Sequence, residues 1–426
     1  MGMTRQMKFN IKDKLQKIDK DHYYLLTEIG KVSEGLGLKS YLVGGMVRDL
    51  LLDFDNLDID IVIENNAKQL AEALVKKFPN CELAAKHDRF HTAKVIFNIN
   101  GKKIPIDLAS TREETYEHPA ALPTVSVSDL KKDLYRRDFT INALAVSLLP
   151  ENFGEVIDLF DGLIDLKEKK IRVLHALSFI DDPTRMIRAV RFACKLGFTI
   201  EENTNKVLKE AIESKQFNNL IEKIRGDRVR IEIRYLFNLS NTEDAVKVFF
   251  DSGIYRMISV DLKHCRNAIN CISTNNGIRQ WLIPFALTME NLPPDKQENI
   301  LKDLQLTNEE IKIIKDGFNV ANKLKEKQTI DSIIIYQELK NLSIESVIIV
   351  QILTQKINDL INEYLNKTSK IKLEITGQDL IIMGVKEGKM IGEILDKVLE
   401  MKIKNPNMNR NDEMKEADRI VKIIKL

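Results

Sequence analysis

The segment 40–61 constrains the fold more than any other part of the chain. Residues 41–43 are apolar and partly β-branched, which predicts a buried strand. Gly44 and Gly45 interrupt the apolar run and allow a ligand to approach the backbone closely. Residues 46–52 predict a helix, whose first free N–H groups and positive dipole end favour a phosphate.

Two carboxylates follow this turn. Asp58 and Asp60 are two residues apart in a second predicted strand, 57–61, so both side chains lie on one face. Like charges held together cost energy unless a cation offsets them, and this pair suits Mg²⁺ bound to a nucleoside triphosphate. A glycine pair or an Asp-x-Asp alone is usually an ordinary turn or edge. The combination with Arg48, which can bind a phosphate through two N–H groups, is more specific.

Composition limits the class of protein. A chain of 426 residues is too long for one ordinary core and predicts about three or four domains. Lys and Arg number 65 against 63 Asp and Glu, so any contact with nucleic acid must come from local patches. The cysteines are widely spread and lack zinc spacing, which favours a reduced, cytoplasmic protein. No apolar run approaches the length of a membrane span.

The pattern along the chain predicts an α+β protein with a mixed head and a helical remainder. Residues 67–78 predict an amphipathic helix, and 92–99 with 103–108 predict a hairpin around an Asn-Gly turn. Asp107 lies in its second strand as a candidate third carboxylate. Segment 113–129 lacks periodicity and is interpreted as a mobile loop, and 143–148 as a further strand. From about residue 172 the pattern is almost wholly helical.

Segment 135–143 joins two arginines to an aspartate before an apolar strand. Asp138 and Asn142 are candidates for binding ribose hydroxyls, while Arg136 and Arg137 could face phosphates or RNA. An exposed charged turn capped by Asp138 is the simpler interpretation of this segment taken alone.

Segment 180–192 begins with Asp182 before a proline, a good start for a helix. Capping does not explain Arg185, Arg188 and Arg191, whose spacing of three spreads them over about 120° of one helix face. Such a cationic face next to a carboxylate suits a nucleotide pocket, although three arginines can also form a solvated face. His87 is interpreted as structural or adjacent to substrate.

These segments, in this order, resemble the class II tRNA nucleotidyltransferases (CCA-adding enzymes) and bacterial poly(A) polymerases, within the polymerase-β-like nucleotidyltransferases. The glycine turn with Asp58 and Asp60 resembles the first motif of that family. The later motifs are matched by 136–143 (RRDFTINA), 158–166 (DLFDGLIDL), 181–185 (DDPTR) and 226–232 (GDRVRIE). Segments 375–380 (ITGQDL) and 391–395 (IGEIL) are similar to the tRNA-binding tail of many such enzymes.

The resemblance implies a role for each motif. Asp58 and Asp60 would hold Mg²⁺, and Asp107 would orient or deprotonate the terminal RNA hydroxyl. The nucleotide would bind to residues from all three segments: Gly44, Gly45, Arg48, Arg137, Asp138, Asn142, Asp182, Arg185, Arg188 and Arg191. Asp138 would test for the ribose 2′-OH, and Asp182 with Arg185 would read the amino group and ring acceptor of C or A.

The resemblance also implies an organisation: a nucleotidyltransferase head at 1–172, a base-selecting helical neck at 173–236, a helical body at 237–328 and a tRNA-binding helical tail at 329–426. It implies addition of CCA to the 3′ end of tRNA from CTP and ATP. No association with a membrane is expected. A-only or CC-only addition and poly(A) synthesis share the head and neck and stay open, as does a non-catalytic RNA-binding protein.

Two further features bear on these alternatives. The family usually has Glu before the base-reading Asp, where this chain has Asp181, whose shorter side chain could alter how the pocket adapts between C and A. A basic cluster is a candidate contact for the tRNA acceptor arm, and a solvated helix face is an equal alternative. Its members are Lys223, Arg225, Arg228, Arg230 and Arg234.

Overall fold

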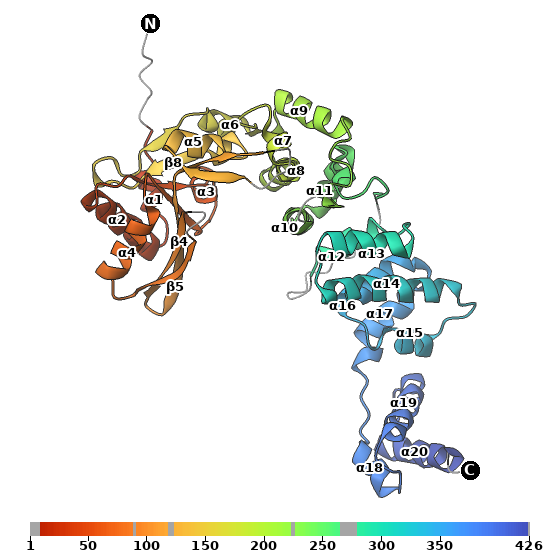
Figure 1. The fold of residues 1–426 in the computed structure, drawn as a ribbon. Coiled ribbons are helices and arrows are strands. Elements are labelled where there is room, and N and C mark those ends of the chain that lie inside the picture. The colour runs from red at the N-terminus through yellow and green to blue at the C-terminus, as the bar shows by residue number, and fades with distance from the viewer. Residues whose placement is uncertain (1–8, 88–90, 118–122, 223–225, 265–278, 425–426) are drawn as a thin grey trace. The chain divides into compact units, whose positions relative to one another are not determined.

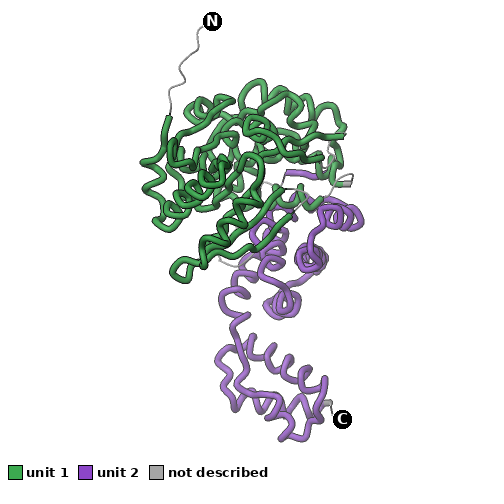
Figure 2. Tube along the Cα trace, turned by 60° about the vertical axis from the view of Figure 1, so that its left-hand side comes forward, with its two compact units in different colours: residues 1–260 green, residues 261–426 purple. Residues whose placement is uncertain are grey.

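The computed structural model describes residues 9–87, 91–117, 123–222, 226–264 and 279–424. The chain divides into two compact units, 1–260 and 261–426, coloured separately in Figure 2. The first unit holds all of the sheets, and the second is helical in its described residues. The α+β prediction is therefore confirmed. The finer division at 172, 236 and 328 stays a prediction.

A seven-stranded mixed sheet forms the centre of the first unit (Figure 1), in the order β3-β4-β5-β2-β1-β8-β9. Only β2 and β5 pair in parallel; the other neighbours are antiparallel. The strands are β1 (Ser40–Val43), β2 (Ile59–Ile63), β3 (Cys81–His87), β4 (Thr92–Ile99), β5 (Lys102–Ser110), β8 (Leu144–Ser147) and β9 (Val156–Asp158). The predicted hairpin is confirmed, with Asn100 and Gly101 at positive φ in its turn.

Alternation along the strands decides which side chains are buried. Ile59, Ile61 and Ile63 are almost fully buried, and α4 (Ala67–Lys77) packs along β3, β4 and β5. On the Val62 side of the sheet, α5 (Leu130–Tyr135) contributes Leu130 to a cluster over β1 and β2. The side chain of Asp60 lies on the same face of β2 as Val62, outside this apolar cluster.

The other helices of the first unit begin with α1 (Lys12–Leu15), α2 (Lys20–Gly35), α3 (Gly45–Leu51), α6 (Gly162–Glu168) and α7 (Ser178–Asp181). They continue with α8 (Thr184–Leu196), α9 (Glu202–Glu213), α10 (Gly226–Phe237) and α11 (Thr242–Asp251). Short 3₁₀ turns lie at Thr140–Asn142, Pro150–Asn152, Leu220–Glu222 and Ile254–Met257. Helix α8 packs against both α10 and α11.

One expectation from the sequence was wrong. Segment 113–129 is not simply a loop, because β6 (Arg112–Thr115) pairs antiparallel with β7 (Thr124–Val127). Both strands are short and polar, so they lack the apolar alternation that would have predicted them. The described residues after 172 are almost wholly helical, as predicted; a short strand there, β11 (Thr199–Ile200), pairs in parallel with β10 (Lys170–Ile171).

Among the described residues of the second unit, one hydrophobic cluster is formed by α14–α17 and another by α18–α20 with the segment before them. Its helices are α12 (Leu282–Leu287), α13 (Pro294–Asp303), α14 (Asn308–Glu326), α15 (Ser332–Leu339), α16 (Ile344–Leu353), α17 (Asn358–Asn366), α18 (Gly377–Ile382), α19 (Lys389–Lys404) and α20 (Arg410–Ile424). Two 3₁₀ turns lie at Gln355–Ile357 and Thr368–Lys370. Among the described helices, none is long and apolar enough to cross a bilayer.

Candidate active site

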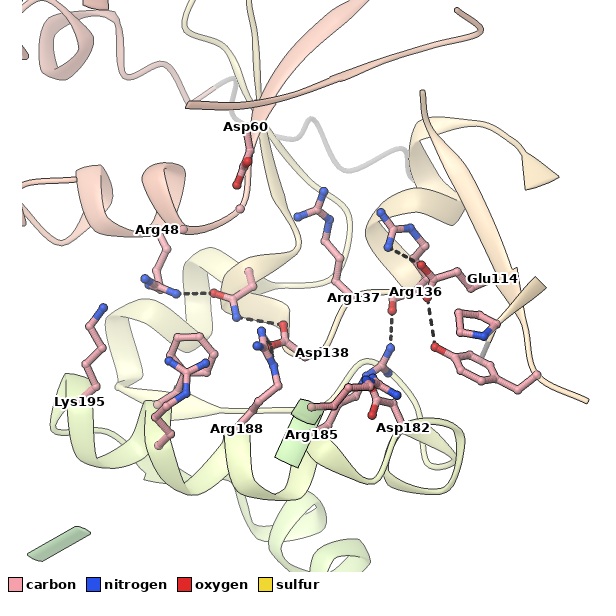
Figure 3. A pocket seen from close by; sticks show the side chains of 18 residues that line it. Arg48, Asp60, Glu114, Arg136, Arg137, Asp138, Asp182, Arg185, Arg188 and Lys195 are labelled. Carbon is pink, nitrogen blue, oxygen red and sulfur yellow. Dashed lines mark hydrogen bonds and ion pairs between the residues drawn. The ribbon is translucent and has the colours of Figure 1, made fainter. Parts of the chain in front are cut away.

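A polar cavity of about 540 Å³ lies in the first unit, and Figure 3 shows the side chains that line it. It brings together the glycine turn, the segment after α5, helix α8, the start of α10 and the β6–β7 hairpin. The lining residues are Gly44, Gly45, Arg48, Asp60, Glu114, Tyr116, Pro123, Arg136, Arg137, Asp138, Asn142, Asp182, Arg185, Arg188, Arg191, Phe192, Lys195 and Arg228. All ten predicted nucleotide-binding residues are among them.

The glycine turn has the geometry that its sequence predicts. Gly44 has φ 76° and ψ −142°, a conformation that favours glycine, and α3 begins at Gly45. A Cβ on Gly44 would lie 3.4 Å from Oδ2 of Asp60 and 3.6 Å from Nη1 of Arg137. The turn therefore lies against both a catalytic candidate and a phosphate-binding candidate.

The carboxylates gather at the start of β2. Asp60 pairs in register with Asp107 of β5, and Asp58 lies one residue before β2, not within it as predicted. Burial and the like charges of Asp107 and Asp58 raise the pKa of Asp60, although Arg137 and Lys94 oppose the shift. The described residues contain no group of three His, Cys, Asp or Glu side chains arranged as a metal site. A cation beside Asp58 and Asp60 would relieve this repulsion.

Arg48 is held by protein groups. Its Nε and Nη2 lie 2.7 and 2.6 Å from Oδ1 of Asp49, and its Nη1 donates to Oδ1 of Asn142 at 2.8 Å. The guanidinium also lies over the ring of Phe192. Each nitrogen of the Arg48 guanidinium therefore has a protein contact, although these contacts use three of its five N–H groups, and its role as a phosphate ligand stays a prediction.

Arg136 and Arg137 share a buried carboxylate. Both donate to Asp133 of α5, at 2.9 to 3.1 Å, and Arg136 also donates to Glu114 at 2.9 Å. Burial alone would raise the pKa of Asp133, but the two guanidinium groups lower it. In Figure 3 the guanidinium of Arg137 extends toward Asp60, while that of Arg136 lies beside Glu114.

Asp138 joins the head segment to α8. Its Oδ1 accepts from the Phe139 N–H and from Nδ2 of Asn142, and its Oδ2 accepts from Nε and Nη2 of Arg188. Burial would raise the pKa of Asp138, but the charge of Arg188 and these hydrogen bonds lower it. Arg188 also contacts Glu232 of α10 at 2.9 Å.

Glu232 in turn accepts from Arg191 at 2.7 Å. Burial lowers the pKa of the Arg191 guanidinium, and the charge of Arg188 adds to this, against the opposing effect of Glu232. Because the Glu232 carboxylate contacts both Arg188 and Arg191, it holds the cationic face of α8 toward the cavity.

The predicted base-reading pair lies at the start of α8. Asp182 accepts from Thr184 through Oδ1 and from Nη2 of Arg228 through Oδ2, at 2.7 Å. Its carboxylate therefore caps the start of the helix, although the N-cap residue itself is Pro183. Arg185 is buried and donates to Oγ of Ser178 and to the carbonyl oxygen of Arg136.

Two described members of the basic cluster have different surroundings. Arg228 lines the nucleotide cavity and pairs with Asp182, whereas Arg234 is exposed on α10. Lys223 and Arg225 lie outside the described residues.

Sequence reasoning missed several lining residues: Glu114, Tyr116, Pro123, Phe192, Lys195 and, as a pocket residue, Arg228. Glu114, Tyr116 and Pro123 lie in or beside the β6–β7 hairpin, whose strands show no clear alternation of apolar and polar residues. Tyr116 donates to Glu114, and burial with the Glu114 charge raises its pKa. Phe192 directly follows Arg191 in the sequence. Its position on α8, next to the arginine series, is the sequence feature that indicates a lining residue.

Three family descriptions match the chain. They are the poly A polymerase head domain at residues 40–172, a probable RNA- and SrmB-binding site of polymerase A at 197–263, and a putative tRNA nucleotidyltransferase domain 2 at 274–417. A solved structure described as a CCA-adding enzyme in an apo form has 31% identity and a TM-score of 0.80, with 99% of this chain and 100% of that chain covered. The Thermotoga maritima CCA-adding enzyme complexed with tRNA_CCA gives 30% identity and a TM-score of 0.79, covering 98% and 100%.

Curated relatives include A-adding tRNA nucleotidyltransferases. The protein of that name from Geobacter sulfurreducens is 34% identical over 93% of this chain and 47% of its own length. The one from Aquifex aeolicus is 33% identical over 85% and 44%. The chain thus spans about half the length of these two relatives.

The sheet, the cavity and these matches define a nucleotidyltransferase. The chain belongs to the class II CCA-adding enzyme family, whose members here are named CCA-adding and A-adding enzymes.

Proposed function

We propose that this protein adds CCA to the 3′ end of tRNA from CTP and ATP, releasing pyrophosphate. The observation that carries the proposal is one cavity that joins Asp60 to the pair Asp182 and Arg185. It combines a carboxylate suited to nucleotidyl transfer with a donor and an acceptor suited to reading a base. Similar solved structures described as CCA-adding enzymes with ATP and with CTP support the same substrates.

Base choice follows from hydrogen-bond pattern. A carboxylate accepts from the amino group of C or A, and a guanidinium donates to the adjacent ring nitrogen. U and G present the opposite pattern at those positions and would leave buried polar groups unpaired. Asp182 and Arg185 would therefore select C and A without a nucleic-acid template, while Asp138 and Asn142 would contact the ribose.

The transfer step joins the RNA to the α-phosphate. The 3′-hydroxyl oxygen forms a bond to the α-phosphorus, the bond from that phosphorus to the oxygen bridging to the β-phosphate breaks, and pyrophosphate leaves. Asp107, in register beside Asp60, would accept the hydroxyl proton. Gly44, Gly45 and the arginines of α8 would hold the triphosphate.

The donor chemistry at the start of β2 fits a hard divalent cation. Asp58 and Asp60 would hold Mg²⁺, which supplies neutralisation of the triphosphate charge and activation of the hydroxyl when bound. The raised pKa of Asp60 supports this, because charges repelling one another in the folded protein are what such a cation would offset. The cytoplasm is the compartment that we infer for this activity.

A-only addition is a second candidate, favoured by the names of the Geobacter and Aquifex relatives. The test uses two tRNA acceptors, one lacking CCA and one ending in CC, each with CTP, ATP or both, read on a sequencing gel. CCA addition predicts a three-nucleotide extension of the first acceptor with both nucleotides. Extension of only the CC-ended tRNA, with ATP, would establish the A-adding alternative. No extension of either acceptor would refute the proposed activity.

A further inference from the structure

The loop between α3 and β2 carries one of the two carboxylates that would hold the cation. Residues 53–58 are exposed except for Asn56, which is partly buried. Phe54 and Leu57 are 50% and 45% exposed, so apolar packing contributes little to holding this loop. Asp58 lies at the end of the loop, one residue before β2. The position of its carboxylate therefore depends on hydrogen bonds made by the loop.

The side chain of Asn56 joins this loop to α3. Its Oδ1 accepts from the N–H of Asp58 at 2.9 Å, which alone is an ordinary asparagine turn. Its Nδ2 also donates to Oδ2 of Asp49 at 2.8 Å, and this second contact ties the turn to a buried carboxylate. A Cβ on Gly45 would lie 3.4 Å from the same Nδ2, so the amide lies against the glycine turn of the nucleotide cavity. Both contacts together require a side chain with one donor and one acceptor.

The two carboxylate oxygens of Asp49 have different partners. Oδ1 contacts Nε and Nη2 of Arg48 at 2.7 and 2.6 Å, which leaves Oδ2 for Asn56. The carbonyl oxygen of Asp49 also accepts from the N–H of Phe54 at 2.8 Å. Arg48 in turn donates to Asn142 through Nη1. The loop that carries Asp58 is thus attached to the residue that also orients Arg48 in the nucleotide cavity.

We propose that Asn56 is a positioning residue, which fixes the carboxylate of Asp58 beside Asp60 by linking the Asp58 backbone to Asp49. The inference rests on the proposed transfer activity and on the cation that it uses. Groups that hydrogen-bond to a metal ligand fix its orientation, and their loss typically lowers metal affinity by about ten- to a hundredfold. Here the hydrogen bond is to the backbone of the ligand residue, so it determines where the side chain begins. The exposure of the rest of the loop makes this contact important.

The test measures Mn²⁺ binding to the whole chain from the electron paramagnetic resonance signal of the free ion. Asn56→Ala should weaken Mn²⁺ binding about tenfold. It should raise the Mg²⁺ concentration for half-maximal tRNA extension by a similar factor, and excess Mg²⁺ should recover most of kcat. Asn66→Ala is the matched control, because Oδ1 of Asn66 accepts from the N–H of Gln69 at the start of α4. This control should lose thermal stability and leave Mn²⁺ binding unchanged.

A paired substitution tests the hydrogen bonds themselves. Asp49→Asn should weaken Mn²⁺ binding about tenfold, because Arg48 takes the remaining oxygen and the new amide then presents a donor to the donor of Asn56. Combining Asp49→Asn with Asn56→Asp reverses donor and acceptor, keeps the total charge and should recover most of the lost affinity. This pair keeps the test decisive if Asn56→Ala does not fold.

Two results would overturn the inference and leave Asn56 as a structural contact of the loop. One is unchanged Mn²⁺ binding in Asn56→Ala, and the other is no recovery of binding in the paired variant. Failure of the unaltered protein to extend either tRNA acceptor is a different result. It refutes the proposed activity, whereas the Mn²⁺ measurements still decide the role of Asn56.

Discussion

Arg188 of α8 donates through Nε, at 2.9 Å, and through Nη2 to the same oxygen of Asp138, which lies in the segment after α5. The other nitrogen of the guanidinium reaches Glu232 of α10. One side chain therefore links three parts of the nucleotide cavity. Because Asp138 and Glu232 are both buried, this link contributes to the fold as well as to the site.

Removing that link should destabilise the first unit selectively. Arg188→Met removes the charged partner of the buried Asp138 and leaves the buried Glu232 with Arg191 alone, and we expect a loss of about 2 kcal/mol in its free energy of unfolding. Arg234→Met, at an exposed position of α10, should change it by less than about 0.5 kcal/mol. The single tryptophan, Trp281, is buried in the second unit, so its fluorescence supplies an internal control. A fluorescence transition shifted as far as the circular-dichroism transition would contradict the prediction.

The same pair predicts a dependence of stability on pH. The pKa of Asp138 is lowered in the folded protein, so its contribution is present above the unfolded value of about 3.9 and is lost as the pH falls through the folded value. Urea denaturation between pH 3 and pH 6 should therefore show a steeper loss of stability in the wild type than in Asp138→Asn. Parallel pH profiles for the two proteins would argue against a lowered pKa.

The glycine turn offers a matched pair of substitutions. Gly44→Ala adds a Cβ at a positive φ, 3.4 Å from Asp60 and 3.6 Å from Arg137, and should cost about 1–3 kcal/mol together with most of the activity. Gly35→Ala, at the end of α2, meets no atom within 4 Å and should leave activity unchanged while stability stays equal or rises slightly. Thermal melting and nucleotide incorporation measure both effects. Full activity in Gly44→Ala would refute a close approach of substrate to this turn.

Substitution of Asp60 should change activity and stability in opposite directions. Its pKa is raised, so its favourable contribution is present below the unfolded value and is lost as the pH rises through the folded value. At neutral pH the charged form is therefore a cost, and Asp60→Asn should keep or raise the melting temperature while kcat falls about a thousandfold or more. Asp58→Ala should also abolish turnover, whereas Asp55→Asn, exposed in the preceding loop, should not. Retained activity in Asp58→Ala would refute the metal assignment.

Local rules explain which features the sequence predicted. The glycine turn, the hairpin with Asp107 and the spacing of Arg185, Arg188 and Arg191 depend on periodicity within one or two elements. Each lies in the structure where its pattern placed it. The family resemblance ordered these pieces. The glycine turn and the three arginines line one cavity, and Asp107 pairs in register with Asp60 of that cavity.

Contacts between distant segments explain what the sequence did not predict. Arg228 was assigned to a candidate RNA contact, which stays a prediction, and its contact with Asp182, 46 positions earlier, was not predicted. The assignment of Arg48 to a phosphate stays a prediction, but its contacts with Asp49 and with Asn142, 94 positions later, were not predicted. The residues next to a charged side chain in the sequence do not show whether a buried carboxylate will face it, because that depends on tertiary packing.

Asp181 and Asp182 are adjacent, but they face different surroundings. The carboxylate of Asp181 lies 4.0 Å from the ring of His175, and it is not among the described residues that line the nucleotide cavity. Burial and the charge of Arg185 lower the pKa of His175, against the opposing effect of Asp181. Asp182, in contrast, lines the cavity and accepts from Arg228. The substitution of Asp for the usual Glu at 181 therefore changes a side chain outside the cavity wall.

This difference predicts distinct results for the two positions. Asp181→Glu should change the ratio of kcat/KM for CTP and ATP by less than about threefold, because no contact with the base is altered. Asp182→Asn keeps the size but replaces one acceptor oxygen by a donor, and should reduce selectivity against UTP and GTP by about a hundredfold. Single-nucleotide incorporation with each of the four triphosphates measures both. A change of product length in Asp181→Glu, with Asp182→Asn still selective, would reverse the two assignments.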